Sequence, residues 1–186
     1  MFTLEVDSGL TLTLVEKTFA AKYLKIVSQQ RAYLSQWLVW PLLAHDEVFF
    51  EGFIEKSLHD YAIGKSLVCG MIYDGELVGN VSFNTINQSL KKVEIGYWLS
   101  AEHQGKGIVS RSVAKLIDLA FTELQMEKVE IFVATENKAS RSVCERLGFE
   151  LEGVITRAEQ LNGRTYDHAA YGLSRGGGVK VMRSTR

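Results

Sequence analysis

Apolar residues alternate with polar ones, or form short apolar runs, over seven stretches of the chain, a pattern typical of β-strands. These stretches are residues 10–15, 66–73, 77–84, 91–99, 128–134, 149–161 and 164–173. The dipeptides Asp74-Gly75 and Asn162-Gly163 each separate two neighbouring stretches, and both favour a two-residue hairpin turn. The first half of the chain therefore predicts an antiparallel meander, and its end predicts a further hairpin.

Apolar residues recur at helical spacing over five other stretches. These predicted helices cover residues 18–29, 31–38, 46–63, 109–124 and 137–147. The second should end before Pro41, and Asp46 suits the N-cap of the third. The helix over 109–124 separates the strands 91–99 and 128–134 too widely for a hairpin, so we expect them to pair in parallel. The fold class expected is mixed α/β with an antiparallel N-terminal half.

The 186 residues suit one domain, which we expect to span residues 1–175, followed by a disordered tail over 176–186 that starts with three glycines. The net charge of −1 gives no basic field for nucleic acid, and no apolar run approaches the roughly 20 residues that span a bilayer. The two cysteines, Cys69 and Cys144, form neither a zinc motif nor a disulfide framework. Together with the lack of a leader segment, they favour a cytoplasmic protein.

The candidate chemistry starts where a strand, a glycine loop and a helix follow one another, in the stretch EIGYWLSAEHQGKGIVSRSV. The first turn of a helix leaves N–H groups without partners, and the helix dipole adds positive charge there. Glycines let the backbone approach a phosphate closely. The loop therefore predicts an anion site, although neither Walker A nor the dinucleotide fingerprint is present. The alternative is a surface turn that caps an ordinary helix.

The order Gln104-x-x-Gly107-x-Val109 resembles the pyrophosphate loop Q/R-x-x-G-x-G/A of the GNAT N-acetyltransferases, with Val109 in place of the last small residue. A second GNAT stretch, N-x-x-S-x-x-x-Y-x-x-x-G-F, is matched by Asn137 and Ser140, but Cys144 stands at the tyrosine. That tyrosine often serves as the acid for the leaving thiolate in the superfamily. A buried, inert cysteine is the interpretation we favour for Cys144.

The resemblance implies the GNAT acyl-CoA N-acyltransferase fold, with helices on both faces of a mixed sheet, acetyl-CoA as co-substrate and no metal. It further implies that Leu99 contacts the acetyl-pantetheine arm where two parallel strands splay apart. The remaining residues that the resemblance implies for the cofactor are Gln104, Gly105, Lys106, Gly107, Ile108, Val109, Ser110 and Asn137.

Two further stretches, YLSQWLVWP at 33–41 and LEG followed by AEQLNG at 151–163, resemble the Rim-like branch that acetylates ribosomal-protein N-termini. By that resemblance Glu159 is the general base, and Ser140 protonates the leaving thiolate. From the residues alone, Glu159 could equally be an exposed strand carboxylate and Ser140 a helix-capping serine. Trp37 and Trp40 could form a wall of the substrate groove or pack in the core.

The four histidines show no metal-ligand spacing; His103 could neighbour the cofactor and His168 the substrate, but a structural or solvated role fits each better. The function expected is transfer of an acetyl group to a protein N-terminal amine, on a ribosomal protein. A small-molecule amine acetyltransferase and a non-catalytic CoA-binding module remain as alternatives. Homodimers are common in this branch, but the sequence reveals no exposed face that would form one.

Overall fold

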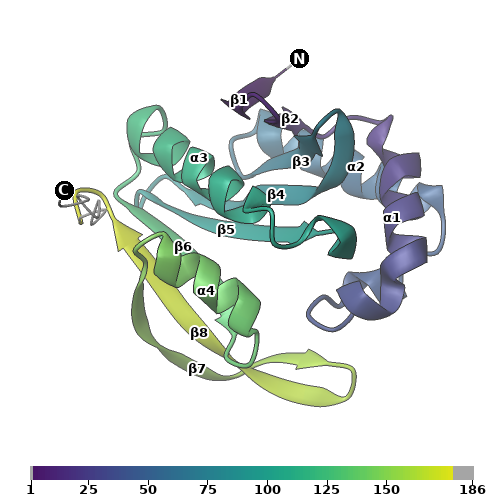
Figure 1. Ribbon diagram of the computed structural model, residues 1–186. Helices are drawn as coiled ribbons and strands as arrows, with labels where there is room; N and C mark the ends of the chain where they lie inside the picture. Colours follow the sequence, from purple (N-terminus) through teal and green to yellow (C-terminus); the bar gives the residue numbers. More distant parts are fainter. Residues whose placement is uncertain (1, 178–186) are drawn as a thin grey trace, which may run out of the picture.

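The computed structural model describes residues 2–177, in which eight strands form one mixed sheet of order β1-β2-β3-β4-β5-β6-β8-β7 (Figure 1). The strands are β1 Thr3–Asp7, β2 Leu10–Leu14, β3 Leu67–Tyr73, β4 Glu76–Asn87, β5 Lys92–Leu99, β6 Lys128–Ala134, β7 Glu150–Leu161 and β8 Arg164–Ser174. The helices are α1 Phe19–Leu34, α2 Glu47–Ala62, α3 Ile108–Thr122 and α4 Lys138–Arg146, with short 3-10 turns at Trp40–Leu42 and Ala101–His103. The expected fold class is confirmed.

The strands β5 and β6 pair in parallel, as expected, whereas the other neighbours in the sheet are antiparallel. Their parallel pairing covers only Lys92 to Glu94 against Lys128 to Glu130. Beyond Glu94, β5 pairs with β4 alone, and β6 continues along β8. The two strands therefore diverge toward their carboxyl ends, as Figure 1 shows.

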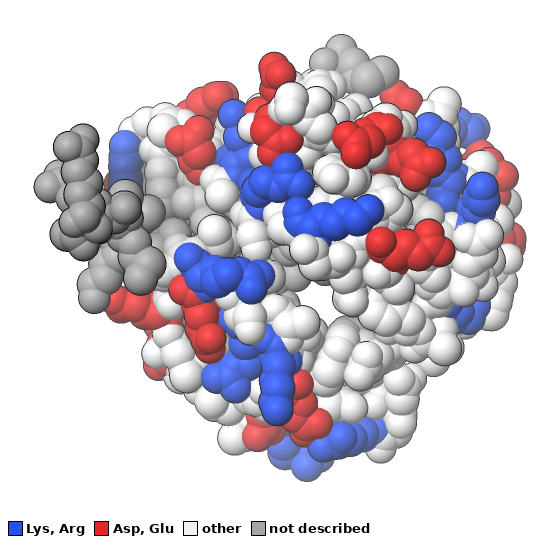
Figure 2. Space-filling model, in the orientation of Figure 1, with Lys and Arg blue, Asp and Glu red and all other residues white. Residues whose placement is uncertain are grey.

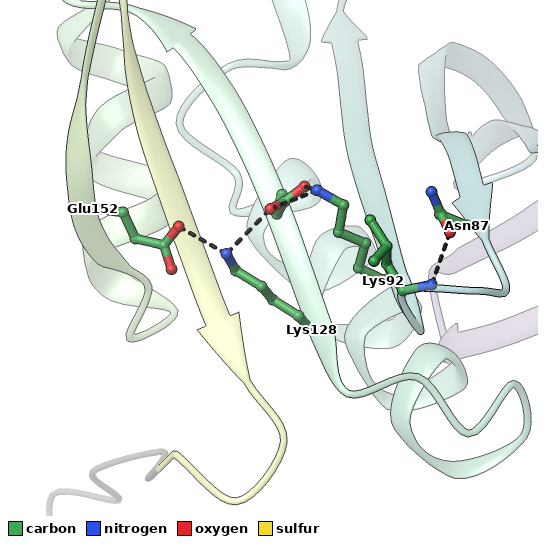
Figure 3. A network of polar contacts seen from close by, with 6 residues as sticks. Asn87, Lys92, Lys128 and Glu152 are labelled. Carbon is green, nitrogen blue, oxygen red and sulfur yellow. Dashed lines mark hydrogen bonds and ion pairs between the residues drawn. The ribbon is translucent and has the colours of Figure 1, made fainter.

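A row of ion pairs crosses the sheet at the closed end of this divergence (Figure 3). Lys92 Nζ lies 2.9 Å from Glu130 Oε2, and Lys128 Nζ lies 3.1 Å from Glu130 Oε1 and 2.8 Å from Glu152 Oε2. Burial alone would raise the pKa of Glu130, but the hydrogen bonds from the two lysines outweigh it and lower that pKa. Glu152 reaches Lys128 across Gly172, where a Cβ would stand 2.4 Å from Glu152 Oε1. The row thus links β5, β6 and β7.

Helices cover both faces of the sheet (Figure 1). Val113, Leu116 and Ala120 of α3 are fully buried against one face, in the apolar stripe that the sequence predicted. The helices α1 and α2 bury a second cluster against the other face, which includes Tyr23 and Phe50. Each face of the β5–β6 divergence is therefore flanked by helices.

The N-terminal part of the fold differs from the sequence prediction in two respects. The two helices expected at 18–29 and 31–38 form one helix, α1, which is kinked at Gln30 with φ −128° and ψ 24°. At the kink Gln30 Oε1 accepts a hydrogen bond from Ala101 N at 2.7 Å. The strand β1 was missed, although Phe2, Leu4 and Val6 alternate with polar residues and β2, of the same five-residue length, was predicted.

Two further expectations concern the chain end and membranes. Of the tail predicted to be disordered, Gly176 and Gly177 follow β8, whereas 178–186 lies outside the described residues, so that prediction stays untested. Within residues 2–177, no helix is both long and apolar enough to cross a bilayer.

Candidate active site

A cleft of about 1410 Å³ lies where β5 and β6 diverge, and Figure 2 shows the corresponding hollow with Lys and Arg side chains near it. One part of its wall comes from the start of α3 and from α4, and another from α1, α2 and the segment between them. All predicted site residues except Lys106 line it: Leu99, Gln104, Gly105, Gly107, Ile108, Val109, Ser110, Asn137, Ser140, Glu159, Trp37 and Trp40. The side chain of Lys106 instead places its Nζ 5.4 Å from the ring centroid of Tyr73.

The glycine loop presents backbone N–H groups at the start of α3. Gly105 and Gly107 have φ values of +75° and +68°, in the left-handed region that favours glycine. Gly107 is the N-cap without a side-chain cap, and the first helical hydrogen bond runs from Arg111 N to Gly107 O at 3.0 Å. The N–H groups of Ile108, Val109 and Ser110 come before the first hydrogen bond of the helix and are available to an anion. Val109 packs its side chain against the core, so the substitution relative to the family pattern leaves its N–H in place.

Two arginines lie beside this loop. Arg111 donates from Nη2 to Lys106 O at 3.2 Å and from Nε to Gly107 O at 3.3 Å. It also forms an ion pair with Asp7 of β1, and its hydrogen bond is the main cause that lowers the pKa of Asp7. Arg146 at the end of α4 donates to Ser110 Oγ at 3.2 Å, and both arginines line the cleft. The sequence analysis named neither. Arg111 stands four residues after Gly107, at a helical spacing that could have revealed it, whereas Arg146 meets Ser110 across 36 residues.

Ser140 faces the cleft from the first turn of α4. Asn137 caps this helix, since its Oδ1 accepts from Ser140 N at 3.1 Å. Ser140 Oγ lies 2.6 Å from the phenol oxygen of Tyr97 on β5, which also lines the cleft. Burial raises the pKa of Tyr97 well above its ordinary value, so the phenol stays protonated. Cys144 is fully buried outside the cleft lining, and burial raises the pKa of its thiol to about 12.

Glu159 meets His168 at the far side of the cleft, with His168 Nε2 3.0 Å from Glu159 Oε2. A bulge in β7 brings them together, because three residues of β7 stand opposite Asp167 alone between the pairs Ile155–His168 and Glu159–Tyr166. The bulge is held by a hydrogen bond of 2.8 Å from Arg157 N to Asp167 Oδ1. The sequence analysis favoured a structural or solvated His168; the structure places it in the cleft, and the register shift that does so leaves no sequence signal.

Aromatic side chains line the cleft on the α1–α2 side. Trp40 lies 5.7 Å from Trp98 and 6.0 Å from Phe50, ring centroid to centroid, so it both packs in the core and faces the cleft. Trp37 packs against Tyr166 at 5.8 Å. The carboxylates in the described lining are Glu94 and Glu159. Among residues 2–177, no group of three or more His, Cys, Asp or Glu side chains is placed to hold a metal ion.

Comparison with known proteins identifies the class. Residues 10–150 match the family described as acetyltransferase (GNAT) domain, and the chain belongs to this family. It is 35% identical to YdaF of Bacillus subtilis, whose name proposes a ribosomal N-acetyltransferase, over 93% of this chain and 95% of that protein. It is 30% identical to the ribosomal-protein-serine acetyltransferase of Escherichia coli, over 86% and 89% of the two chains. The spermidine N(1)-acetyltransferase of Vibrio cholerae is 29% identical over 87% and 91%.

Among solved structures, the ribosomal L7/L12 alpha-N-protein acetyltransferase RimL in complex with coenzyme A has a TM-score of 0.91 at 26% identity, covering 95% of this chain and all of that one. The protein is an acetyl-CoA-dependent N-acetyltransferase. Its cleft fits the cofactor chemically: free N–H groups and two guanidinium groups suit a diphosphate, and the β5 edge beyond Glu94 has no strand partner on the β6 side.

Proposed function

We propose that this enzyme acetylates the N-terminal amine of a protein, and that the acceptor is a ribosomal protein. In this proposal Gln104 to Ser110 hold the diphosphate of acetyl-CoA, and Leu99 contacts the pantetheine arm. Asn137 orders the nearby start of α4, and Trp37 and Trp40 line the acceptor side. Glu159 is the general base, and Ser140 assists departure of the thiolate.

The observation that carries the acceptor class is the aromatic wall with few carboxylates. A polyamine brings several ammonium groups into a site, and each needs an anionic partner when it leaves water. Among the described lining residues only Glu94 and Glu159 are acidic, and Asn84 Nδ2 approaches Glu94 Oε1 at 3.4 Å. With Glu159 beside His168, the cleft suits a single amine attached to an uncharged, extended segment better than a polyamine.

The proposed chemistry uses the two sides of the cleft. An ammonium cannot attack a thioester, so Glu159 accepts one proton from the acceptor amine, and His168 hydrogen-bonds to the carboxylate that takes it. The C–N bond then forms, and the nitrogen, now positively charged, loses its second proton to water. The C–S bond breaks, and its electron pair goes to sulfur. Ser140 donates a hydrogen bond to this developing thiolate, which takes up a proton from water on release. Amine and thioester thereby give amide and thiol.

The names of the relatives support both candidate acceptors, but not equally. The ribosomal-protein-serine acetyltransferase and the L7/L12 enzyme named above act on ribosomal proteins, in agreement with the proposal. The spermidine acetyltransferases make a small polyamine the second candidate, and the two carboxylates Glu94 and Glu159 in the cleft lining are the feature that favours it.

Mass spectrometry of a cell extract separates the two candidates. The extract is incubated with isotope-labelled acetyl-CoA and either the wild-type enzyme or its Glu159→Gln variant, and intact small amines and digested proteins are analysed separately. The proposal expects label on protein N-termini with the wild-type enzyme and much less with the variant. Label confined to spermidine or another small amine would refute the proposed acceptor.

The proposal extends to the location and assembly of the enzyme. A ribosomal acceptor and acetyl-CoA together place it in the cytoplasm. A homodimer is supported by β7, which ends the sheet and exposes Leu151, Val154 and Ile155 by about half of their surface (49%, 52% and 47%). Light scattering of the purified protein tests this, since the mass of a monomer at micromolar concentration would exclude the dimer.

A further inference from the structure

We propose that Tyr97 is a positioning residue, whose phenol donates a hydrogen bond to Ser140 Oγ and thereby directs the serine hydroxyl toward the thioester sulfur. This inference rests on the acetyl transfer and the role of Ser140 proposed above. The pair of hydroxyl groups of Tyr97 and Ser140 would act on the leaving thiolate in a chain in which Cys144 replaces the family tyrosine of α4.

The geometry places the two hydroxyl groups in one corner of the cleft. Tyr97 comes from β5 just beyond the last parallel pair with β6, and Ser140 comes from the first turn of α4. Their oxygens are 2.6 Å apart, and both residues line the cleft. Ser140 lies one helical turn before Cys144, and the phenol of Tyr97 reaches this first turn of α4 from β5.

The direction of the hydrogen bond follows from the chemistry of the two groups. A phenol is a better hydrogen-bond donor than an aliphatic hydroxyl, and the buried phenol of Tyr97 keeps its proton. Ser140 Oγ, at 2.6 Å, is then a much nearer acceptor for the phenol than Ser140 O, at 3.4 Å. Ser140 N already donates to Asn137 Oδ1. The remaining proton of Ser140 is free to point into the cleft.

During the reaction Tyr97 neither gains nor loses a proton. As the C–S bond breaks, negative charge moves to sulfur, and the Ser140 hydroxyl donates a hydrogen bond to the sulfur. This hydrogen bond increases the negative charge on Ser140 Oγ, and the hydrogen bond donated by the phenol stabilises that charge. Hydrogen bonds in such a chain polarise one another, and those to a charged acceptor are the strongest. Tyr97 therefore stabilises the departing thiolate only through Ser140.

A double-mutant cycle in kcat tests this dependence. Tyr97→Phe removes the phenol oxygen and keeps the ring, and we expect kcat to fall about tenfold, the loss of one hydrogen bond to the transition state. The Kd of coenzyme A by calorimetry and the KM for acetyl-CoA should stay within about twofold. In the Ser140→Ala background, adding Tyr97→Phe should change kcat by less than twofold, because the serine hydroxyl through which the phenol acts is gone and the remaining contact to the backbone carbonyl of residue 140 does not reach the sulfur.

Thiol release is measured with whichever amine the wild-type enzyme acetylates fastest, so a wrong acceptor assignment leaves the cycle intact. Tyr61→Phe, on the outer part of α2 and outside the cleft lining, is the matched control and should keep the wild-type kcat. A Tyr97→Phe enzyme that retains wild-type kcat overturns the inference, as does a tenfold loss that persists in the Ser140→Ala background. A wild-type enzyme that releases no thiol with any amine would instead overturn the proposed function.

Discussion

Substitution of Gly107 tests the glycine loop most directly. Its φ of +68° lies in the left-handed region, and a Cβ there would meet only Arg111 Nε at 3.9 Å. Gly107→Ala therefore creates no clash, and its cost is the backbone strain of about 1–2 kcal/mol for a residue with a Cβ. If the loop relaxes in the free enzyme, this cost appears on binding as a roughly 5- to 30-fold weaker affinity for coenzyme A. If the loop does not relax, the same cost appears in the free energy of unfolding.

Gly107→Glu adds a charge to the same strain. A carboxylate about 4 Å from a diphosphate charge is repelled by roughly 4 kcal/mol at an effective dielectric constant near 20, a loss of about a thousandfold. With the strain included, binding should fall below detection by calorimetry. We expect unfolding in urea to remain cooperative, because the Cβ position has no neighbour closer than Arg111 Nε at 3.9 Å.

Gly64→Ala is the matched control for both variants. Gly64 has a φ of +72° with no atom within 4 Å of its Cβ position, and it follows α2 outside the cleft lining. The Gly64→Ala substitution should lower the free energy of unfolding by a similar amount, about 1–2 kcal/mol, without changing the Kd of coenzyme A. A Gly107→Glu enzyme that binds coenzyme A as tightly as the wild type would refute the assignment of the loop.

Three other variants probe the base and the elements that hold the site. Glu159→Gln should depress kcat at neutral pH and recover activity as pH rises and more acceptor amine is neutral; a wild-type pH–rate profile would exclude Glu159 as the base. Asp167→Ala removes the acceptor for Arg157 N in the β7 bulge, so kcat should fall severalfold while coenzyme A binding measured by calorimetry stays unchanged. Asp7→Asn should destabilise the fold at neutral pH. The hydrogen bond from Arg111 lowers the pKa of Asp7 in the folded state, so the ion pair stabilises the fold fully above the unfolded-state pKa of about 3.9. This contribution disappears as the pH falls through the folded-state pKa. Urea unfolding at pH 7 and pH 3 measures this, and an equal difference at both values would contradict it.

The parts of the fold and site that could be predicted from sequence are those encoded over short distances. The order of a strand, the glycines 105 and 107 and an amphipathic helix predicts an anion site, because the end of the strand, the loop and the start of the helix lie within the twenty residues 94–113. The dipeptide Asn162-Gly163 gives the last hairpin, whose central residues have φ values of +53° and +75°. Family patterns added Ser140 and Glu159, which the structure brings into one cleft.

The residues that sequence analysis missed depend on contacts between distant segments. Tyr97 looked like one aromatic residue of a strand, and its relation to Ser140 exists only because β5 and β6 diverge. His168 reaches Glu159 through a bulge that interrupts the strand register. The kink in α1 coincides with the hydrogen bond from Ala101 N to Gln30, 71 residues apart, so local helical propensity could not reveal it.

The contact between Arg111 and Asp7 makes β1 a structural support of the glycine loop, the proposed diphosphate site. A strand of five residues at the sheet edge thus holds the guanidinium group that reaches the loop carbonyls. If the loop holds the diphosphate as proposed, trimming this segment, or fusing a bulky tag close before it, weakens the binding of acetyl-CoA, even though more than ninety residues separate Asp7 from the loop in sequence. Expression tags are therefore better placed at the other terminus.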